Sequence, residues 1–270
     1  MAIVSISRGS YSQGKAVAEK VAERLGYECL SRDVLLQASD QFNIPEITLE
    51  HAIKDAPSIL ERFSHGRQRY VAYIQSALTR NLCRDNVVYH GLAGHVLLKN
   101  VSHVLKVRII ADMGLRVAIV MKREKLGQKE ARSYIAKLDS ERRKWTRSLY
   151  GVDPWDPTLY DLLLNLPRFE VNDAVELICR SAEMKQFKTT PESNKEMEDL
   201  ALACQIKAAV VEKHPDVFVA SKYGNVLVYC TEGDRHARKL KAIIGELCST
   251  IEGVNNVEVH AGVTPPANAV

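Results

Sequence analysis

The chain has 270 residues, which suits either one large domain or a large domain joined to a small one. Hydrophobic residues make up 46% of it and charged residues 26%, as in an ordinary soluble globular protein, and the formal net charge of +4 is too small to indicate nucleic-acid binding by itself. No apolar run approaches the roughly 18–20 residues that span a bilayer, and no basic segment precedes an apolar stretch at the N-terminus. We therefore expect a cytoplasmic protein without a signal peptide or transmembrane segment.

The cysteines give no sign of a metal site or a disulfide framework. None belongs to a C-x-x-C pair, and most have apolar neighbours, so the spacing predicts reduced thiols packed as small hydrophobic side chains. The six are Cys29, Cys83, Cys179, Cys204, Cys230 and Cys248.

The first elements are a strand, a glycine-containing loop and a helix. Residues 2–6 are apolar and β-branched, which predicts a buried strand, and apolar residues recur at helical spacing over 17–25 before Gly26. The loop between them reads GSYSQGKA and matches the phosphate-binding pattern G-x-x-x-x-G-K-[ST] except at its last position. We call residues 9–16 the glycine loop.

A loop of this kind surrounds phosphates with backbone N–H groups at the positive end of the following helix. We expect the glycine loop to bind the phosphates of ATP, with Lys15 reaching the outer ones; a simple turn with an exposed lysine is the alternative. Ala16 cannot hold Mg²⁺ as a serine or threonine would, so the metal is bound by other groups and water or only weakly. The expected cofactor-binding residues are Gly9, Ser10, Tyr11, Ser12, Gln13, Gly14, Lys15 and Ala16.

Strands and helices alternate through the next part of the chain, which predicts a parallel α/β sheet. Residues 114–150 are helical and strongly basic. The expected strands are 29–30, 86–90, 103–110 and 160–166, and the other expected helices are 31–42, 59–82 and 173–184.

The C-terminal part has a different pattern. The polar stretch 186–197 contains a proline and predicts a linker. A small α+β unit over 198–262 follows, and the tail 263–270 is expected to be disordered. Its expected order is a helix over 198–213, strands 217–220 and 226–230, a helix over 236–251 and a strand over 257–260.

Four blocks of the first 185 residues resemble the cytidylate kinase-like family, relatives of the nucleoside monophosphate kinases. They read SISRGSYSQGKAVAEKVAERLGY, LSRDVL, LKVRIIADMGLRV and KLDSERRKWTRSLYGVDPWDPTLYDLLLN. The resemblance implies a P-loop kinase-like domain over 1–185, with flanking helices and a mobile helical lid. One departure is that the family's Gly-Arg pair after the third strand is Gly91-Leu92 here.

The resemblance also implies roles for charged residues outside the glycine loop. Arg116, Asp139 and Arg142 fall where lid and phosphate contacts are expected, and with Lys15 they form the expected catalytic set. For most cations of the basic segment a solvated helix face is the alternative, and the few aromatic residues among them argue against an RNA surface. The expected substrate-binding residues are Arg8, Arg32, Asp33 and Arg123. Asp112, after a buried strand, is either a helix cap or a group that organises Mg²⁺ through water.

Residues 198–262 resemble a BON domain in their order of elements and in the segment Glu-Gly-Val-x-x-Val that ends at Val257. The resemblance implies a unit that senses a small ligand or docks to a partner, and self-association is the alternative.

These features lead to two hypotheses about function. The first is an enzyme that transfers a phosphoryl group from ATP to a nucleoside monophosphate such as CMP or dCMP, or to a related small acceptor. The second is a catalytically weak nucleotide-binding regulator whose BON-like unit senses a ligand. Lys15 and the segment from Asp139 to Arg142 favour the first; Ala16, Val17 and Leu92 favour the second.

Overall fold

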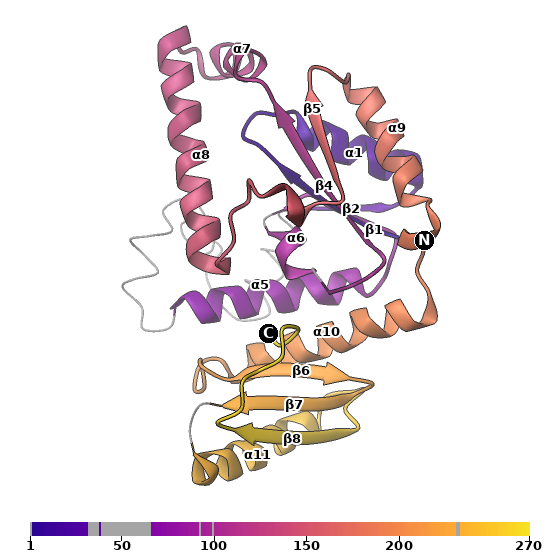
Figure 1. Cartoon of the computed structure of the whole chain (residues 1–270), viewed down its shortest axis with the longest axis vertical. Coiled ribbons are helices and arrows are strands. Elements are labelled where there is room, and N and C mark those ends of the chain that lie inside the picture. Colours follow the sequence, from indigo (N-terminus) through magenta and orange to yellow (C-terminus); the bar gives the residue numbers. More distant parts are fainter. Residues whose placement is uncertain (1, 32–37, 39–65, 92, 99, 231–232) are drawn as a thin grey trace. The chain divides into compact units, whose positions relative to one another are not determined.

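The computed structural model describes residues 2–31, 38, 66–91, 93–98, 100–230 and 233–270. The described residues divide into two compact units, each with its own sheet (Figure 1). No helix in these ranges is both long enough and apolar enough to cross a membrane.

The first unit is built on a five-stranded sheet in which every neighbouring pair is parallel. This confirms the predicted parallel α/β architecture. The strand order is β2 (Glu28–Leu30), β3 (Val87–Tyr89), β1 (Ile3–Arg8), β4 (Val104–Ala111) and β5 (Leu162–Leu166). Because β1 lies at the centre, the loop that follows it emerges from the middle of the carboxyl edge of the sheet, where ligands of open α/β sheets gather.

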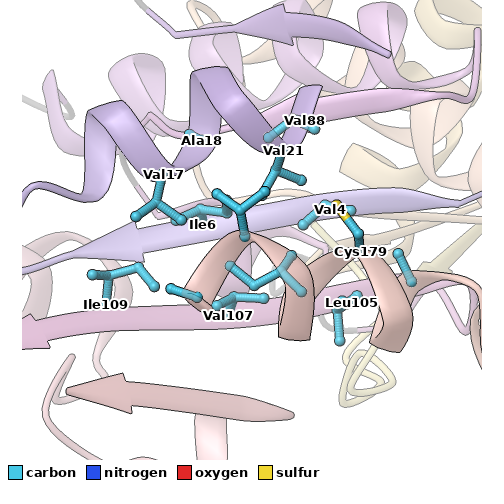
Figure 2. Packing of buried hydrophobic residues seen from close by; sticks show 14 of the residues in the cluster. Val4, Ile6, Val17, Ala18, Val21, Val88, Leu105, Val107, Ile109 and Cys179 are labelled. Carbon is cyan, nitrogen blue, oxygen red and sulfur yellow. The ribbon is translucent and has the colours of Figure 1, made fainter. Parts of the chain in front are cut away.

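Two helices cover one face of this sheet. Val17 and Val21 of α1 (Gly14–Leu25) pack on Ile6 of β1 and Val107 of β4 in the main hydrophobic cluster, as Figure 2 shows. Cys179 of α9 (Val171–Ala182) joins the same cluster. The apolar positions of α1 recur at helical spacing, and Gly26 ends the helix at φ 67°.

The basic segment, predicted to be helical, forms two helices. α7 (Met113–Glu124) ends at Lys125, whose φ is 55°, and α8 (Gln128–Tyr150) follows. Val117 and Val120 of α7 pack on Ala131 and Ile135 of α8, which holds the helices together as a hairpin. The remaining short elements of the unit are α6 (Gly94–Leu97), η1 (Pro157–Leu159) and η2 (Lys185–Phe187).

The second unit has a three-stranded sheet with helices packed against it. The predicted order of helix, two strands, helix and strand is present: α10 (Pro191–Val210), β6 (Phe218–Lys222), β7 (Asn225–Cys230), α11 (Asp234–Cys248) and β8 (Asn256–Ala261). β6 and β7 are antiparallel, whereas β7 and β8 are parallel.

The helix α5 (Gly66–Leu82) belongs to this second unit, although it precedes most of the first unit in the sequence. Ala72 and Tyr73 of α5 form a buried cluster with Ala208 and Val211 at the end of α10. The Tyr73 hydroxyl also donates to the Glu212 carboxylate at 3.3 Å. From the sequence, this helix is expected to belong to the first domain. Its pattern predicts a helix but does not indicate which helix it packs against.

Two expectations about the C-terminal half are wrong in detail. Residues 191–197 are helical rather than a linker, because Thr190 caps α10: its hydroxyl accepts from the Ser193 N–H at 3.2 Å and Pro191 occupies the first turn. The tail is also ordered at its end, since Val270 and Val219 exchange two backbone hydrogen bonds of 2.9 and 3.0 Å. This pairing holds Val270 beside the edge strand β6 of the second sheet.

Candidate active site

The glycine loop leaves β1 and turns sharply into α1. The Gly9 N–H donates to the Ile109 carbonyl of the neighbouring strand at 2.9 Å, and the Ser12 hydroxyl donates to the Gly9 carbonyl at 2.9 Å. Tyr11 and Gln13 adopt left-handed conformations with φ of 57° and 58°. Alternation of left-handed and ordinary residues turns successive N–H groups toward one side, which is the geometry of a backbone anion site.

Gly14 is required by close packing rather than by a special backbone angle. A Cβ atom at Gly14 would lie 2.7 Å from Cβ of Arg8 and 3.5 Å from Cβ of Ile109. Because these atoms sit next to the backbone, they cannot move aside cheaply. Gly14 therefore lets the start of α1 approach the end of β1.

Lys15 and Ala16 face solvent at the start of α1. The Lys15 side chain is 63% exposed, and its Nζ lies 3.5 Å from Oε1 of Glu19, one turn along the helix. An exposed pair of this kind contributes little stability, so Lys15 is free to turn toward a ligand. Ala16 offers no hydroxyl at this position.

Two of the predicted arginines bind Ser10, and a predicted aspartate binds one of them. We call Ser10, Arg116, Asp139 and Arg142 the Ser10 cluster. Arg116 donates from Nε to the Ser10 carbonyl at 2.8 Å and from Nη2 to Asp139 Oδ2 at 2.6 Å. Arg142 donates from Nη1 to the Ser10 hydroxyl at 3.1 Å. The α7–α8 hairpin thus binds the glycine loop through the guanidinium groups of Arg116 and Arg142.

The two arginines have different amounts of bonding capacity left. Arg116 has an 11% exposed side chain and is tied to both a carbonyl and a carboxylate. Arg142 keeps solvent access and donates to a neutral hydroxyl. Arg142 is therefore better placed to bind an added anion, while Arg116 holds the loop.

Arg8, the last residue of β1, adds another positive charge beside the loop. Partial burial of its guanidinium lowers its pKa, and the nearby Arg142 lowers that pKa further. Partial burial also lowers the pKa of Arg142, an effect that Asp139 opposes. Like charges brought together in this way favour an anion between them.

Tyr11 turns its ring away from the loop and onto the α7–α8 hairpin. It packs against the hydrophobic cluster of the hairpin, and its hydroxyl lies 3.2 Å from Glu124 Oε1 and 3.4 Å from the Tyr134 hydroxyl. Arg123 is 73% exposed, and its guanidinium lies 5.8 Å from the centre of the Tyr11 ring. Arg123 is thus near the loop without joining the Ser10 cluster. The other two predicted substrate-binding residues, Arg32 and Asp33, lie outside the described residues.

Other arginines of α8 are engaged in an ion-pair network at its end. Arg143 and Arg147 both donate to the Asp153 carboxylate, and the Arg143 guanidinium lies 4.3 Å from the centre of the Trp155 ring. The two arginines hold the pKa of Asp153 well below its ordinary value. Arg143 therefore has a structural role at the end of α8, which is the alternative to a phosphate contact.

Asp112 acts as a helix cap: its Oδ1 accepts from the Leu115 N–H at 2.8 Å at the start of α7. No group of three or more His, Cys, Asp or Glu side chains in the described ranges is arranged to hold a metal ion.

A second polar cluster lies on the opposite face of the sheet from α1, and sequence reasoning missed it. We call Ser7, His95, Arg108 and Tyr160 the Arg108 cluster. Arg108 Nη1 donates to the Ser7 hydroxyl at 3.0 Å and to the Tyr160 hydroxyl at 3.1 Å, and the Tyr160 hydroxyl lies 3.2 Å from Nε2 of His95. The sequence did carry one indication of polar groups on this face of the sheet, because the cations Lys106 and Arg108 occupy alternate positions of an otherwise apolar strand.

Comparison with known proteins places the first unit. The model of the "Cytidylate kinase-like family" matches residues 3–168. The chain belongs to the cytidylate kinase-like family. Among its relatives in this family, the cytidylate kinase of Archaeoglobus fulgidus is 28% identical over 188 residues, covering 68% of this chain and 97% of the relative. The cytidylate kinase of Methanopyrus kandleri is 32% identical over 101 residues, covering 35% of this chain and 52% of the relative.

The fold of this cytidylate kinase-like chain also resembles a solved structure. An uncharacterized protein from Eubacterium ventriosum superposes with a TM-score of 0.53 at 19% identity, over 68% of this chain and all of the other. The parallel five-stranded sheet with flanking helices fits a P-loop kinase-like α/β fold. The family match ends before α10, so it gives no support to a BON-like assignment of the second unit.

Proposed function

We propose that the protein transfers a phosphoryl group from ATP to a nucleoside monophosphate, with CMP or dCMP as the acceptor. Family membership and the relatives named cytidylate kinase support nucleotide-kinase-type chemistry. The observation that carries the proposal is the gathering of Arg8, Arg116 and Arg142 at a loop with the geometry of an anion site.

The glycine loop fits the phosphates of ATP, which supplies the phosphoryl group. Its backbone N–H groups and the N-terminus of α1 would bind phosphate oxygens, and Lys15 would neutralise the outer charge. Arg142 would stabilise the negative charge that builds up on the transferring group. Arg116 and Asp139 position Arg142 and the loop, because their mutual hydrogen bond fixes both helices of the hairpin against Ser10.

The described residues fit Mg²⁺ less well than they fit the phosphates of ATP. Ala16 replaces the usual hydroxyl ligand, and the Asp112 carboxylate already caps α7. Any metal that accompanies ATP would therefore be held by phosphate oxygens and water, and no step here depends on it. Arg8 and Arg123 are proposed to face the acceptor, and the predictions for Arg32 and Asp33 stand untested.

The first experiment compares two lysines of α1. Lys15→Met removes the proposed phosphate contact, and Lys20→Met removes an exposed lysine whose Nζ bonds to Asn172 Oδ1 at 2.8 Å instead. With ATP, Mg²⁺ and a panel of nucleoside monophosphates, Lys15→Met should lower kcat/KM by about a hundredfold or more. Lys20→Met should retain the wild-type value.

The outcomes separate the two hypotheses about function. Turnover of CMP or another acceptor that depends on Lys15 supports the kinase. ATP binding that depends on Lys15, without turnover of any acceptor, would favour the hypothesis of a nucleotide-binding regulator over that of a kinase. Absence of ATP binding by the wild-type chain would show that the glycine loop is only a turn. The cytoplasmic location and the BON-like character of the second unit remain predictions from the sequence.

A further inference from the structure

The Arg108 cluster contains a cation that has no anionic partner among the residues that the structure describes. Arg108 is 8% exposed, and it donates hydrogen bonds to the neutral hydroxyls of Ser7 and Tyr160. None of the ion pairs found in the described residues includes it. Burial of a charge without a counter-charge is costly, so a site that keeps one is suited to an anion from outside.

The other members of the cluster cannot balance this charge. The Tyr160 hydroxyl donates to the Pro154 carbonyl at 2.9 Å, which leaves its oxygen to accept from Arg108. Burial, followed by the charges of Arg108 and Lys106, lowers the pKa of His95 to about 3. His95 is therefore neutral at physiological pH, and Lys106 adds a further positive charge nearby.

The guanidinium keeps an unused edge. Within the described part of the chain, Arg108 forms its hydrogen bonds through Nη1, which leaves Nε and Nη2 available. Neither of these two nitrogens is sealed from solvent. These N–H groups can thus be reached, and a guanidinium edge matches two oxygens of a phosphate or carboxylate.

The cluster also lies next to the glycine loop. Ser7 pairs with Arg108 and Arg8 with Ile109 in the register of β1 and β4, and the Ile109 carbonyl accepts from the Gly9 N–H. Arg108 is therefore one residue away from the backbone group that anchors the loop, on the face of the sheet opposite α1.

We propose that Arg108 is a specificity-determining residue that binds the phosphate of the phosphoryl acceptor through its free guanidinium edge. This inference rests on the proposed function for the identity of the ligand, a phosphomonoester. Ser7 and Tyr160 are positioning residues, because they hold Nη1 and so orient the opposite edge. A preference for nucleoside monophosphates over nucleosides follows from this arrangement.

The test uses Arg108→Lys in the full chain, since it keeps the buried charge but loses the two-pronged edge. Arg147→Lys, an exposed arginine, is the matched control. Calorimetric titration without ATP measures binding of CMP and of cytidine, and a separate titration measures ATP. Arg108→Lys should weaken CMP binding at least tenfold, while cytidine and ATP binding stay within twofold of wild type.

A second measurement does not depend on catalysis or on the choice of nucleotide. The Nε–H signal of Arg108, identified by its absence in Arg108→Lys, is followed by NMR during titration with inorganic phosphate. A shift that saturates supports the anion site, including in a chain that phosphorylates no acceptor. A signal that phosphate and CMP both leave unmoved, or CMP binding unchanged in Arg108→Lys, would show that Arg108 only braces Tyr160.

Discussion

Arg142 and Arg143 are adjacent in the sequence but differ in what they can bind. Arg143 is matched with the Asp153 carboxylate and stacks on Trp155, so its bonding capacity is used within the end of α8. Arg142 faces the other way and meets a neutral hydroxyl of the glycine loop. Along a basic helix, the direction of each side chain decides which cation can serve a ligand.

His95 allows a prediction about pH. Its folded-state pKa of about 3 lies below its ordinary value of 6.5, so the unfolded chain binds a proton that the folded chain does not between these pH values. The stability contributed by neutral His95 is present above about pH 6.5 and is lost progressively as the pH falls toward 3. The loss is at most about 1.4 kcal/mol per pH unit in this window.

Urea denaturation of the wild type and of His95→Gln at pH 7 and pH 4.5 measures this effect. The free energy of unfolding should fall less between the two pH values in His95→Gln, because glutamine takes up no proton. An equal fall in the free energy of unfolding in the two proteins would mean that His95 is protonated in the folded state as readily as in the unfolded one.

At the scale of elements, the junction of β1 and α1 depends on Gly14. The Cβ of an alanine there would meet Cβ of Arg8 at 2.7 Å, so either α1 or the end of β1 must shift. Overpacking of this kind costs about 1–3 kcal/mol and would displace the N–H groups of the loop. Gly14→Ala should therefore weaken ATP binding about tenfold or more in a calorimetric titration.

Gly127→Ala is the control for this prediction. Gly127 caps α8 with an ordinary φ of −69°, and its added Cβ would meet only the end of the Glu130 side chain, at 3.4 Å. ATP binding should be unchanged in Gly127→Ala. Wild-type ATP affinity in Gly14→Ala would show that the loop tolerates the shift.

Local pattern was sufficient to predict some elements and contacts but not others. The strand, loop and helix around Gly14 follow from β-branched residues, glycines and helical spacing within one short segment. Arg116 and Asp139 were singled out through the family resemblance, and they do pair. The Arg108 cluster could not be predicted because Ser7, His95 and Tyr160 are distant in sequence. The register of β1 with β4 brings Ser7 to Arg108, and the tertiary fold brings Tyr160 and His95 there.

At the scale of the whole molecule, sequence order and spatial grouping differ. α5 precedes β3 and β4 along the chain but packs against α10 in the second unit. The buried faces of Ala72 and Tyr73 give no indication of which helix they contact. Assignment of α5 therefore needed tertiary structure, whereas the order of elements from α10 to β8 was readable from periodicity alone.

This grouping predicts that a fragment of residues 1–189 is defective. Without α10, the face of α5 that carries Ala72 and Tyr73 loses its cover, and the Tyr73 hydroxyl loses Glu212. The fragment should bind a hydrophobic dye and self-associate in sedimentation velocity, in contrast to the full chain. A monomeric fragment with a sharp thermal transition and no dye binding would contradict the assignment.

The capture of α5 by α10 has a consequence for biosynthesis. A ribosome completes α5 early and then makes β3, β4, the basic hairpin, β5 and α9 before α10 emerges. Throughout that interval the nascent chain carries a helix whose partner does not yet exist, whereas the strands that complete the first sheet have all been made by its end. The first unit can thus fold during translation, and α5 is the segment that a nascent-chain chaperone would have reason to shield until synthesis is almost finished.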